Sequence, residues 1–370
     1  MSREVQYIGL DVDDKAFHGA IMATYGNEVM QFVCKPNIGA LLKKLGSMKV
    51  EKEKLRICYE AGYLGFTLCR EFRKNHIYCD VIAPSLIPDT RGKKVKTDRL
   101  DSVKLAQLYR SGLLTSVHVP SQEDEAERDL IRSRNFLMDQ CRRLQKHILA
   151  LIRRHGMHYK GETGKKRNWT ITHIEWLETQ SGKLTDSNLQ KNLCNLLHHY
   201  KQCTAQIDVY NEEIESMANS EKYKKKVKAL VCYRGIKTQT AMTLITELGD
   251  IKRFSHPEKL TSYCGMDITE YSSGGKEKKY RMTKMGNKHI RTAVIESCQL
   301  ACNAPRVGPD LRRRRQEIDP KMIDVADRCM KRLYKKGTRL LHENKIKNKV
   351  KTACAREMLG FIWESLRAVA

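Results

Sequence analysis

The chain has 370 residues, a length sufficient for two or three domains that each bury a core of their own. It has 69 Lys and Arg against 43 Asp and Glu, and the formal net charge of +26 indicates a polyanionic partner, unless the basic side chains are merely solvated. No apolar run reaches the roughly 18–20 residues of a membrane-spanning helix, and residues 1–4 lead into a strand pattern instead of a signal peptide, so we expect a cytoplasmic protein without membrane contact.

The first 85 residues have the pattern of a mixed α/β domain. Apolar and β-branched runs predict strands at residues 5–12, 17–25, 28–34, 55–60 and 78–83, with helices at 38–45 and 65–75. Gly26-Asn27, between the second and third strands, is typical of a hairpin turn. Three consecutive strands followed by alternating helix and strand are the order expected of an RNase H-like α/β core.

From residue 98 onward the pattern becomes helical, so the predicted fold class is α/β followed by α. Two long amphipathic stretches, 123–155 and 187–217, predict an antiparallel coiled coil around a polar turn near residues 160–168. Their leucine stripe, which we interpret as a structural contact, comprises Leu130, Leu137, Leu144, Leu151, Leu189, Leu193, Leu196 and Leu197.

A second compact unit is expected from about residue 224 to 303, and a basic helical tail that ends in an amphipathic segment at 347–369 follows it. These breaks in the pattern predict three domains, at 1–122, 123–222 and 223–370.

The 13 cysteines are odd in number and contain no Cys-x-x-Cys pair. Most lie in apolar stretches, which predicts reduced, buried thiols instead of disulfides or a zinc site. The examples on which this rests are Cys34, Cys58, Cys69, Cys141, Cys194 and Cys298.

Four acidic residues stand out by their position. Alternation along the first strand puts Asp11 at the end of a strand embedded in a core, and Glu60 likewise ends an apolar run before a turn. In the helix expected after Thr97, Asp98 and Asp101 lie within about 60° of each other, on the stripe that also carries Leu105. We therefore expect these two carboxylates to point inward.

Burying several carboxylates together is unfavourable unless cations neutralise them. Carboxylate oxygens suit Mg²⁺ or Mn²⁺, and two such ions roughly 3.5–4 Å apart would polarise a scissile phosphate. The four acids together therefore favour phosphodiester chemistry. Singly, each has an ordinary alternative: Asp11 as a turn residue, Glu60 as a half-exposed acid, and Asp98 as a helix-start acid that interacts with the helix dipole.

Further segments of interest lie in the distal half of the chain. They are Gly235-Ile236, Thr240-Ala241, Glu247-Leu248-Gly249-Asp250, Arg253-Phe254, Ser272-Ser273-Gly274-Gly275, Thr283-Lys284, Gly286-Asn287, Arg291 and the ending at 355–359. Together with the acidic segments 8–12, 59–61 and 96–106, and in this order and spacing, they resemble the DEDD insertion-sequence transposases of the one-ten family. The resemblance extends over most of the chain.

The resemblance implies a RuvC-like catalytic domain at 1–122, a coiled-coil oligomerisation segment at 123–222 and a serine-containing transposase domain at 223–370. It implies a Mg²⁺ site and a nucleophile that forms a phosphoserine intermediate with DNA. The implied metal ligands are Asp11, Glu60, Asp98 and Asp101, and the nucleophile is Ser273 or its neighbour Ser272. The implied partners are donor and target DNA, a structured guide RNA that pairs with both, and further copies of the chain in a dimer or tetramer, at the nucleoid of a prokaryotic cytoplasm.

Basic residues follow the serine and recur in the tail, and we expect them to hold phosphates. They are Lys276, Lys278, Lys279, Arg281, Lys284, Lys288, Arg291, Arg312, Arg313, Arg314 and Arg315. The two helical stretches within 227–248 form either a hairpin that presents backbone N–H groups to a phosphate or an ordinary helical corner. Without the resemblance, the Ser-Ser-Gly-Gly segment is simply a flexible turn.

Two other functions stay open. One is a metal-dependent RuvC-like nuclease or junction resolvase, which hydrolyses DNA with water and has no covalent step. The other is a noncatalytic protein that binds nucleic acid.

Overall fold

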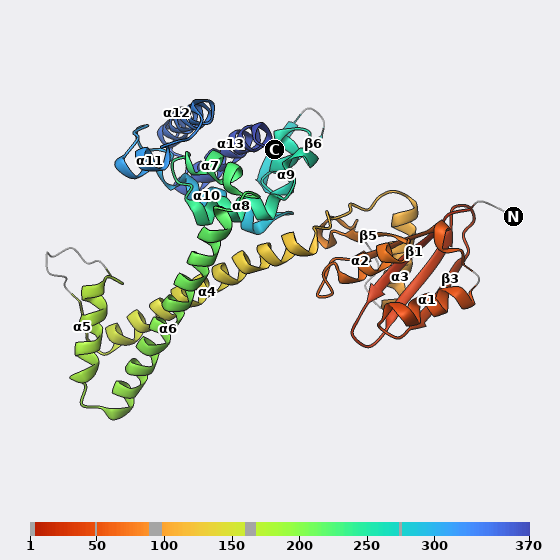
Figure 1. Cartoon of the computed structure of the whole chain (residues 1–370), viewed down its shortest axis with the longest axis horizontal. Helices are drawn as coiled ribbons and strands as arrows, with labels where there is room; N and C mark the ends of the chain where they lie inside the picture. Colours follow the sequence, from red (N-terminus) through yellow and green to blue (C-terminus); the bar gives the residue numbers. More distant parts are fainter. Residues whose placement is uncertain (1–3, 49, 89–97, 160–167, 274–275) are drawn as a thin grey trace. The chain divides into compact units, whose positions relative to one another are not determined.

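The computed structural model describes residues 4–48, 50–88, 98–159, 168–273 and 276–370, and for residues 98, 270–273 and 276–280 it describes the backbone alone. The chain forms two compact units, Met1–Ser121 and Gln122–Ala370, which we call the N-terminal and C-terminal units (Figure 1). The first holds a β-sheet and the second is mostly helical, which confirms the predicted fold class at this level. None of the described helices combines the length and the apolar character that crossing a bilayer requires.

A five-stranded sheet organises the N-terminal unit, in the order β3-β2-β1-β4-β5. Its strands are β1 (Gln6–Val12), β2 (Phe17–Ala23), β3 (Val29–Cys34), β4 (Leu55–Glu60) and β5 (Tyr78–Ile82). The first three form an antiparallel meander, with Gly26 at φ +87° between β2 and β3, whereas β4 and β5 run parallel to β1. The sheet lies where the sequence predicted it and is consistent with an RNase H-like domain.

Helices cover both faces of this sheet: α1 (Ile38–Ser47), α2 (Thr67–Lys74) and α3 (Asp98–Arg110), with 3₁₀ turns η1 (Lys52–Lys54) and η2 (Pro84–Leu86). Ile8 and Leu10 of β1 pack in one apolar cluster with Leu41 of α1 and Phe72 of α2. The helix α3 lies on the opposite face, against β1, β2 and β4 (Figure 1). Both faces of β1 are therefore covered, which explains the fully buried centre of this strand.

Gly9 is the point of closest approach between β1 and α3. A Cβ atom at this position would lie 2.4 Å from both the Ser102 carbonyl oxygen and the Ala106 backbone nitrogen. Carbon atoms do not approach other atoms so closely, so only glycine lets the helix backbone rest on the strand. The position of α3, and of the acids at its start, depends on this glycine.

Replacing Gly9 with alanine should destabilise the N-terminal unit by roughly 1–3 kcal/mol, because the added methyl group overpacks the contact between strand and helix. The matched control is Gly46→Ala in α1, where an added Cβ meets nothing within 4 Å and helix propensity makes the change neutral or slightly stabilising. Hydrogen exchange of the β1 and α3 amides, followed by mass spectrometry, measures the effect. Equal protection in the two variants would contradict the role assigned to Gly9.

Two long helices, α4 (Gln122–Arg154) and α6 (Ser187–Ala218), pack along each other in the C-terminal unit. They run antiparallel. Arg134 of α4 bonds Asn211, whereas Leu137, further along α4, accepts a hydrogen bond from Cys203, which comes earlier in α6. Except for Leu130, the predicted leucine stripe lies in or against the apolar core between the two helices. The antiparallel arrangement agrees with the expectation, and the coiled-coil geometry stays a prediction.

In the sequence between α4 and α6, the structure contains a helix that the sequence pattern did not predict, α5 (Ile171–Gly182). The polar turn expected at residues 160–168 lies almost entirely outside the described residues. Thr170 caps α5, because its side chain accepts a hydrogen bond from the backbone N–H of His173 at 3.3 Å. One of the few buried positions of α5 is this histidine, so the helix has only a weak apolar periodicity.

The globular part of the C-terminal unit surrounds one large apolar core. Its elements are α7 (Lys224–Val231), α8 (Thr238–Leu248), η3 (Ile251–Arg253), α9 (Pro257–Tyr263), β6 (Ile268–Ser273), β7 (Lys276–Met282), α10 (Lys288–Ser297), η4 (Cys298–Leu300), α11 (Pro309–Arg314), α12 (Pro320–His342) and α13 (Lys347–Ala368). The helix α13 packs against α7, α9, α10 and α12 (Figure 1). Ile131 of α4 and Ile214 of α6 also belong to this core, so the helix pair and the globular part share one apolar interior.

The cysteines are free thiols, in line with the prediction of reduced side chains. Most are buried, including Cys58, Cys141 and Cys298. For Cys194, which is exposed on α6, and for Cys34, which is half-buried at the end of the edge strand β3, the prediction of burial was wrong. Cys194 lies on a solvent-facing part of α6, and Cys34 packs against the core cluster but at the end of an edge strand; apolar neighbours in the sequence reveal neither difference.

Candidate functional site

The first candidate site lies at the carboxyl ends of β1 and β4. These strands are parallel neighbours, and their register pairs Leu10 with Tyr59, so Asp11 and Glu60 come next in the same register. Neighbouring strands in a sheet are about 4.8 Å apart. The backbones of Asp11 and Glu60 therefore lie side by side.

Both carboxylates are on the face of the sheet that α3 covers. Side chains alternate along a strand, so Asp11 shares the face of Gly9, which α3 touches. Glu60 shares the face of Cys58, which packs against Leu105 of α3. Asp11 is half-buried and Glu60 is exposed, so this pair lies at the rim of the sheet.

The helix α3 runs antiparallel to β1 and begins near the same strand ends. Tyr109, close to the end of α3, contacts Tyr7 at the start of β1, with ring centroids 5.7 Å apart, and Ser102 touches Gly9. The next residue of β1 on this face is Asp11. It therefore falls opposite the first turn of α3.

That first turn carries Asp98 and the half-buried Asp101. They precede Ser102 and Leu105 by four residues each, so the backbone positions of both lie on the stripe of the helix that faces the sheet. The fold thus brings the backbones of all four predicted acids to one edge of the N-terminal unit. Among the described side chains, which do not include that of Asp98, no group of three or more His, Cys, Asp or Glu is close enough together to hold a metal ion.

The second candidate site is the antiparallel hairpin of β6 and β7, where Ser272 pairs with Glu277 and Ser273 with Lys276. The side chains of both serines lie outside the described set, as do those of Lys276, Lys278 and Lys279. The exposed cations that follow are Arg281, Lys284 and Lys288. Arg291 donates a hydrogen bond to a backbone carbonyl at 2.8 Å, so its side chain contributes to the fold.

The base of this hairpin is held by the turn that precedes it. The backbone N–H of Thr283 donates to the carbonyl of Asp267, and that of Asn287 to the carbonyl of Tyr263, both at 2.9 Å. Gly265 lies in this turn at φ +61°, and a Cβ there would come within 2.8 Å of the facing backbone. The hairpin is therefore fixed at its base by close backbone contacts.

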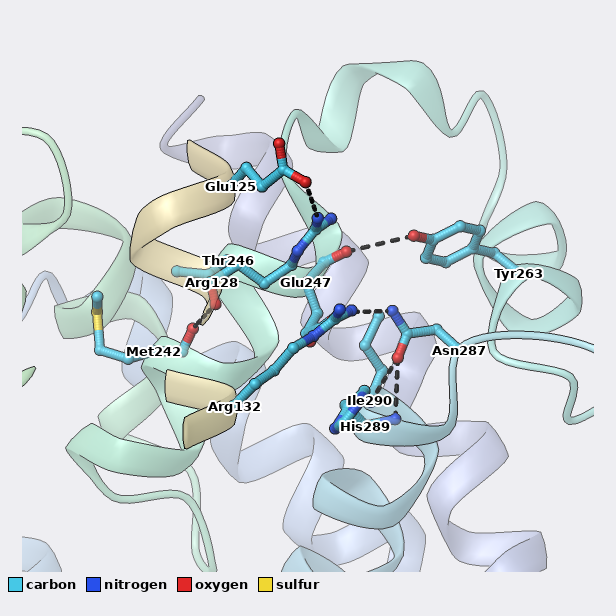
Figure 2. Close-up of polar contacts among 10 residues, drawn as sticks. All are labelled: Glu125, Arg128, Arg132, Met242, Thr246, Glu247, Tyr263, Asn287, His289 and Ile290. Atoms are coloured by element: carbon cyan, nitrogen blue, oxygen red, sulfur yellow. Dashed lines mark hydrogen bonds and ion pairs between the residues drawn. The ribbon is translucent and has the colours of Figure 1, made fainter. Parts of the chain in front are cut away.

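Asn287 connects this base to a buried carboxylate, Glu247 (Figure 2). The Asn287 side chain caps α10, since its Oδ1 accepts hydrogen bonds from the N–H groups of His289 and Ile290. Its Nδ2 donates to Glu247 at 2.7 Å. Arg132 of α4 donates from Nε and Nη2 to the two oxygens of the same carboxylate, at 2.6 and 2.9 Å. One carboxylate, with a side chain only 1% exposed, therefore links α4, α8 and α10.

The ionisation of Glu247 follows from these contacts. Burial opposes the charged form, but the hydrogen bonds from Arg132 and Asn287 outweigh it, so the pKa of Glu247 is lowered. Burial also lowers the pKa of the neighbouring His289. The network therefore contains an ionised carboxylate and a neutral imidazole near pH 7.

The sequence analysis assigned no role to this network. Glu247 and Asn287 fall within segments quoted for the resemblance, but Arg132 is 115 positions from Glu247 inside an amphipathic helix, and no spacing rule pairs them. The available signal was an acid within an otherwise buried helical segment, residues 241–248.

The four arginines at 312–315 divide into two pairs. Arg314 donates to the carbonyl of Ile236 at 2.6 Å and Arg315 to that of Cys232 at 3.0 Å, so these two side chains are used within the fold. The preceding two arginines are exposed. Phosphate contacts therefore stay a prediction for the exposed pair above all.

Comparisons with known proteins agree on one family. A DEDD-type transposase domain of the IS110 group matches residues 8–157, and the model described as "Transposase IS116/IS110/IS902 family" matches residues 228–314. The chain is 34% identical over 319 residues to the putative transposase y4qE of Sinorhizobium fredii (strain NBRC 101917 / NGR234), an alignment that covers 85% of this chain and 76% of that protein. The chain belongs to the IS110 family of transposases.

Other relatives of this transposase have the same kind of name. It is 28% identical over 353 residues to the transposase for insertion sequence element IS1533 of Leptospira borgpetersenii, covering 93% of this chain and 99% of the relative. It is 22% identical over 298 residues to the transposase for element IS1111A of Coxiella burnetii, covering 80% and 78%. Family membership makes it an enzyme of DNA transposition that binds, cuts and rejoins DNA, with a domain type that typically uses divalent metal ions.

Acid should destabilise the C-terminal unit of this transposase through Glu247 and His289. Both have folded-state pKa values below their ordinary values of 4.5 and 6.5, so the unfolded state takes up protons first. The free energy of unfolding therefore falls as the pH drops below 6.5 and falls further below 4.5. Fluorescence-monitored urea unfolding at several pH values measures this unit alone, because it contains all three tryptophans: Trp169, Trp176 and Trp363.

The variant Glu247→Gln separates the carboxylate from the histidine. It should lower the free energy of unfolding at pH 7 by roughly 1–3 kcal/mol, because Arg132 loses its charged partner, and it should reduce the further loss below about pH 5. Glu213→Gln, at an exposed position of α6, is the matched control and should follow the unmodified protein. If the free energy of unfolding of Glu247→Gln fell as steeply below about pH 5 as that of the control, this assignment would be wrong.

Proposed function

We propose that this transposase is guided by a structured RNA and recombines donor and target DNA with a Mg²⁺-dependent acidic site and a serine nucleophile. The single observation that carries the acidic site is the register of β1 and β4, which supports a joint role for Asp11 and Glu60 opposite the first turn of α3. The family supports DNA as the substrate. RNA guidance, the choice of Mg²⁺ and the serine step rest on the motif resemblance.

In this proposal Asp11, Glu60, Asp98 and Asp101 hold the cations, with Mn²⁺ as an alternative to Mg²⁺. Two of these residues end adjacent strands and two lie in the first turn of the helix that covers the same face, so the backbones of all four lie at one edge of the unit. Without cations, the acids at this edge repel one another, and DNA phosphate adds further negative charge. When bound, a divalent ion polarises the scissile phosphate and stabilises the leaving oxygen.

The serine step conserves the number of phosphodiester bonds. The Ser273 oxygen attacks the scissile phosphorus and forms a P–O bond, while the bond to one deoxyribose oxygen breaks. The serine proton passes to a carboxylate or water, and the departing oxygen takes up a proton to become a hydroxyl. In the second step a DNA hydroxyl attacks the phosphoserine, which restores a DNA phosphodiester and releases the serine. Ser272 is the alternative nucleophile.

The proposed chemistry also requires assembly. The serines belong to the C-terminal unit and the acids to the N-terminal unit, so units of one copy or of different copies have to meet at the DNA. We therefore propose a dimer or tetramer in which α4 and α6, of 33 and 32 residues, act as a coiled-coil oligomerisation segment. This corresponds to a functional division at 1–122, 123–222 and 223–370.

Basic side chains would hold the nucleic acids of this assembly at the nucleoid of a prokaryotic cytoplasm. Phosphate binding by exposed Lys and Arg supplies affinity without reading the sequence, whereas base pairing with a guide RNA would supply the specificity. The candidates are the exposed cations after the hairpin, the lysines within it and the exposed pair at the start of 312–315.

Strand exchange by the full-length protein, purified with the RNA that it retains, tests the proposal. Asp11→Asn should reduce DNA cutting at least about 100-fold while RNA binding persists, because a metal ligand is lost. Ser273→Ala should lose the covalent adduct between protein and DNA, and Ser272→Ala is the matched control that should keep it. Denaturing gels with labelled DNA detect both cutting and adduct.

Each alternative has its own outcome in this assay. An adduct that survives in Ser273→Ala but is lost in Ser272→Ala assigns the nucleophile to Ser272. Cutting by the unmodified protein without any adduct identifies a hydrolytic nuclease or junction resolvase. Unchanged recombination by Asp11→Asn would rule out the acidic site.

A further inference from the structure

Two clefts of the C-terminal unit adjoin each other. The first, of about 420 Å³, is lined by α4, α8 and α10, and the second, of about 790 Å³, by the loop before α8 and the segment between α10 and α11. Arg134, Gln239 and Thr240 line both clefts. We call the combined feature the α4–α8 groove, and its cations are Arg132, Arg134, Arg142, Arg234, Lys237, Lys288, Arg306 and Arg314.

The lining of this groove is strongly positive. Its eight Lys and Arg face three acids, Asp139, Glu296 and Asp310, and one of the eight, Arg132, is also paired with the buried Glu247. The ion pairs of Asp139 and Asp310 are with exposed or half-buried arginines and a lysine, so they neutralise only part of the excess. A ligand with several negative charges fits such a surface better than a single anion.

Two half-buried arginines of the groove make no ion pair with a carboxylate of the described residues. Arg134 donates to neutral amide oxygens, of Asn211 at 2.9 Å and of Asn135 at 3.3 Å. Arg234 donates to three backbone carbonyls. Burial lowers the pKa of both, and the charge of Arg142 lowers that of Arg134 further. An incoming anion stabilises a half-buried cation, and more so at Arg134, which lies beside a like charge, so phosphate suits both positions.

An exposed aromatic ring completes the groove. Phe136 of α4 lines the first cleft, yet 61% of its surface is exposed. An aromatic face among cations is the arrangement that binds unpaired nucleotides, because the base stacks on the ring while the phosphates pair with the cations. Bases inside a duplex are already stacked and do not reach such a ring.

We propose that the α4–α8 groove binds a single-stranded stretch of nucleic acid, with one base stacked on Phe136 and neighbouring phosphates at Arg134 and Arg142. This deepens the proposed function and rests on it for the choice of a polynucleotide. Unpaired RNA and an unpaired DNA strand have this chemistry in common, and the experiment distinguishes them.

Equilibrium binding of the full-length protein to fluorescent probes of about 20 nucleotides, longer than one binding site, tests the groove. The probes are single-stranded RNA, single-stranded DNA of the same sequence and duplex DNA. Phe136→Ala should raise the Kd for a single strand about 10-fold at every salt concentration, because one stacked base is lost. Arg142→Gln should instead reduce the slope of log Kd against log salt by about 0.7, the value for one phosphate contact on a single strand.

Matched controls lie close by. Arg143, the exposed neighbour of Arg142 on α4, does not line the groove, and Ile171 is an apolar side chain 77% exposed on α5. Arg143→Gln and Ile171→Ala should change Kd by less than about twofold. Phe136→Trp should retain binding, because the indole ring also stacks on a base.

A loss confined to the RNA probe assigns the groove to RNA, and a loss confined to the single-stranded DNA probe assigns it to an unpaired DNA strand. Either result supports the proposal. The proposal is overturned if the groove variants and their controls have equal Kd values. It is also overturned if the groove variants lose as much affinity for duplex DNA as for a single strand. Neither result bears on the proposed acidic site or the serine. Absence of binding to all three probes overturns the groove and the proposed function together. The proposed function fails by itself if the groove variants lose single-strand binding while Asp11→Asn still recombines DNA.

Discussion

The ion pair between Glu247 and Arg132 is the contact on which the C-terminal unit depends most. An ionised carboxylate in an apolar interior is unfavourable unless its hydrogen-bond partners are in place, and here Arg132 and Asn287 provide them. The three residues come from α4, α8 and the start of α10, so the interaction forms only when these helices are correctly packed. Because Asn287 also ends the segment that follows β7, the placement of the hairpin that carries the two serines is coupled to the same carboxylate.

The N-terminal unit positions the backbones of its acids through strand pairing and apolar packing. Apolar side chains bury both faces of β1, and Gly9 lets the backbone of α3 approach the strand. Parallel pairing of β1 with β4 then brings two acids to one edge, and the direction of α3 brings two more. The backbone positions of these four acids are thus set by strand pairing, apolar packing and one glycine contact.

The sequence predicted those parts of the structure that depend on residues close together in the chain. The strands were predictable from alternation and from Gly26-Asn27, whereas the parallel register that places Glu60 beside Asp11 came from the structure. The ion pair of Arg132 with Glu247 was not predictable, since both residues lie in helices whose amphipathic patterns are satisfied without it. The helix α5 was missed because its buried face includes a histidine, which contributes no apolar periodicity.

The cations behind the net charge of +26 are of two kinds. Arg132, Arg314 and Arg315 are bound by a carboxylate or by carbonyl groups of their own chain, so they stabilise the fold and are screened little by salt. Exposed cations, and half-buried ones such as Arg134 that face no carboxylate of the described residues, gain most from phosphate. Salt therefore weakens nucleic-acid binding at lower concentrations than it weakens folding. Which group a cation belongs to depends on its burial and its partners, and the composition gives neither.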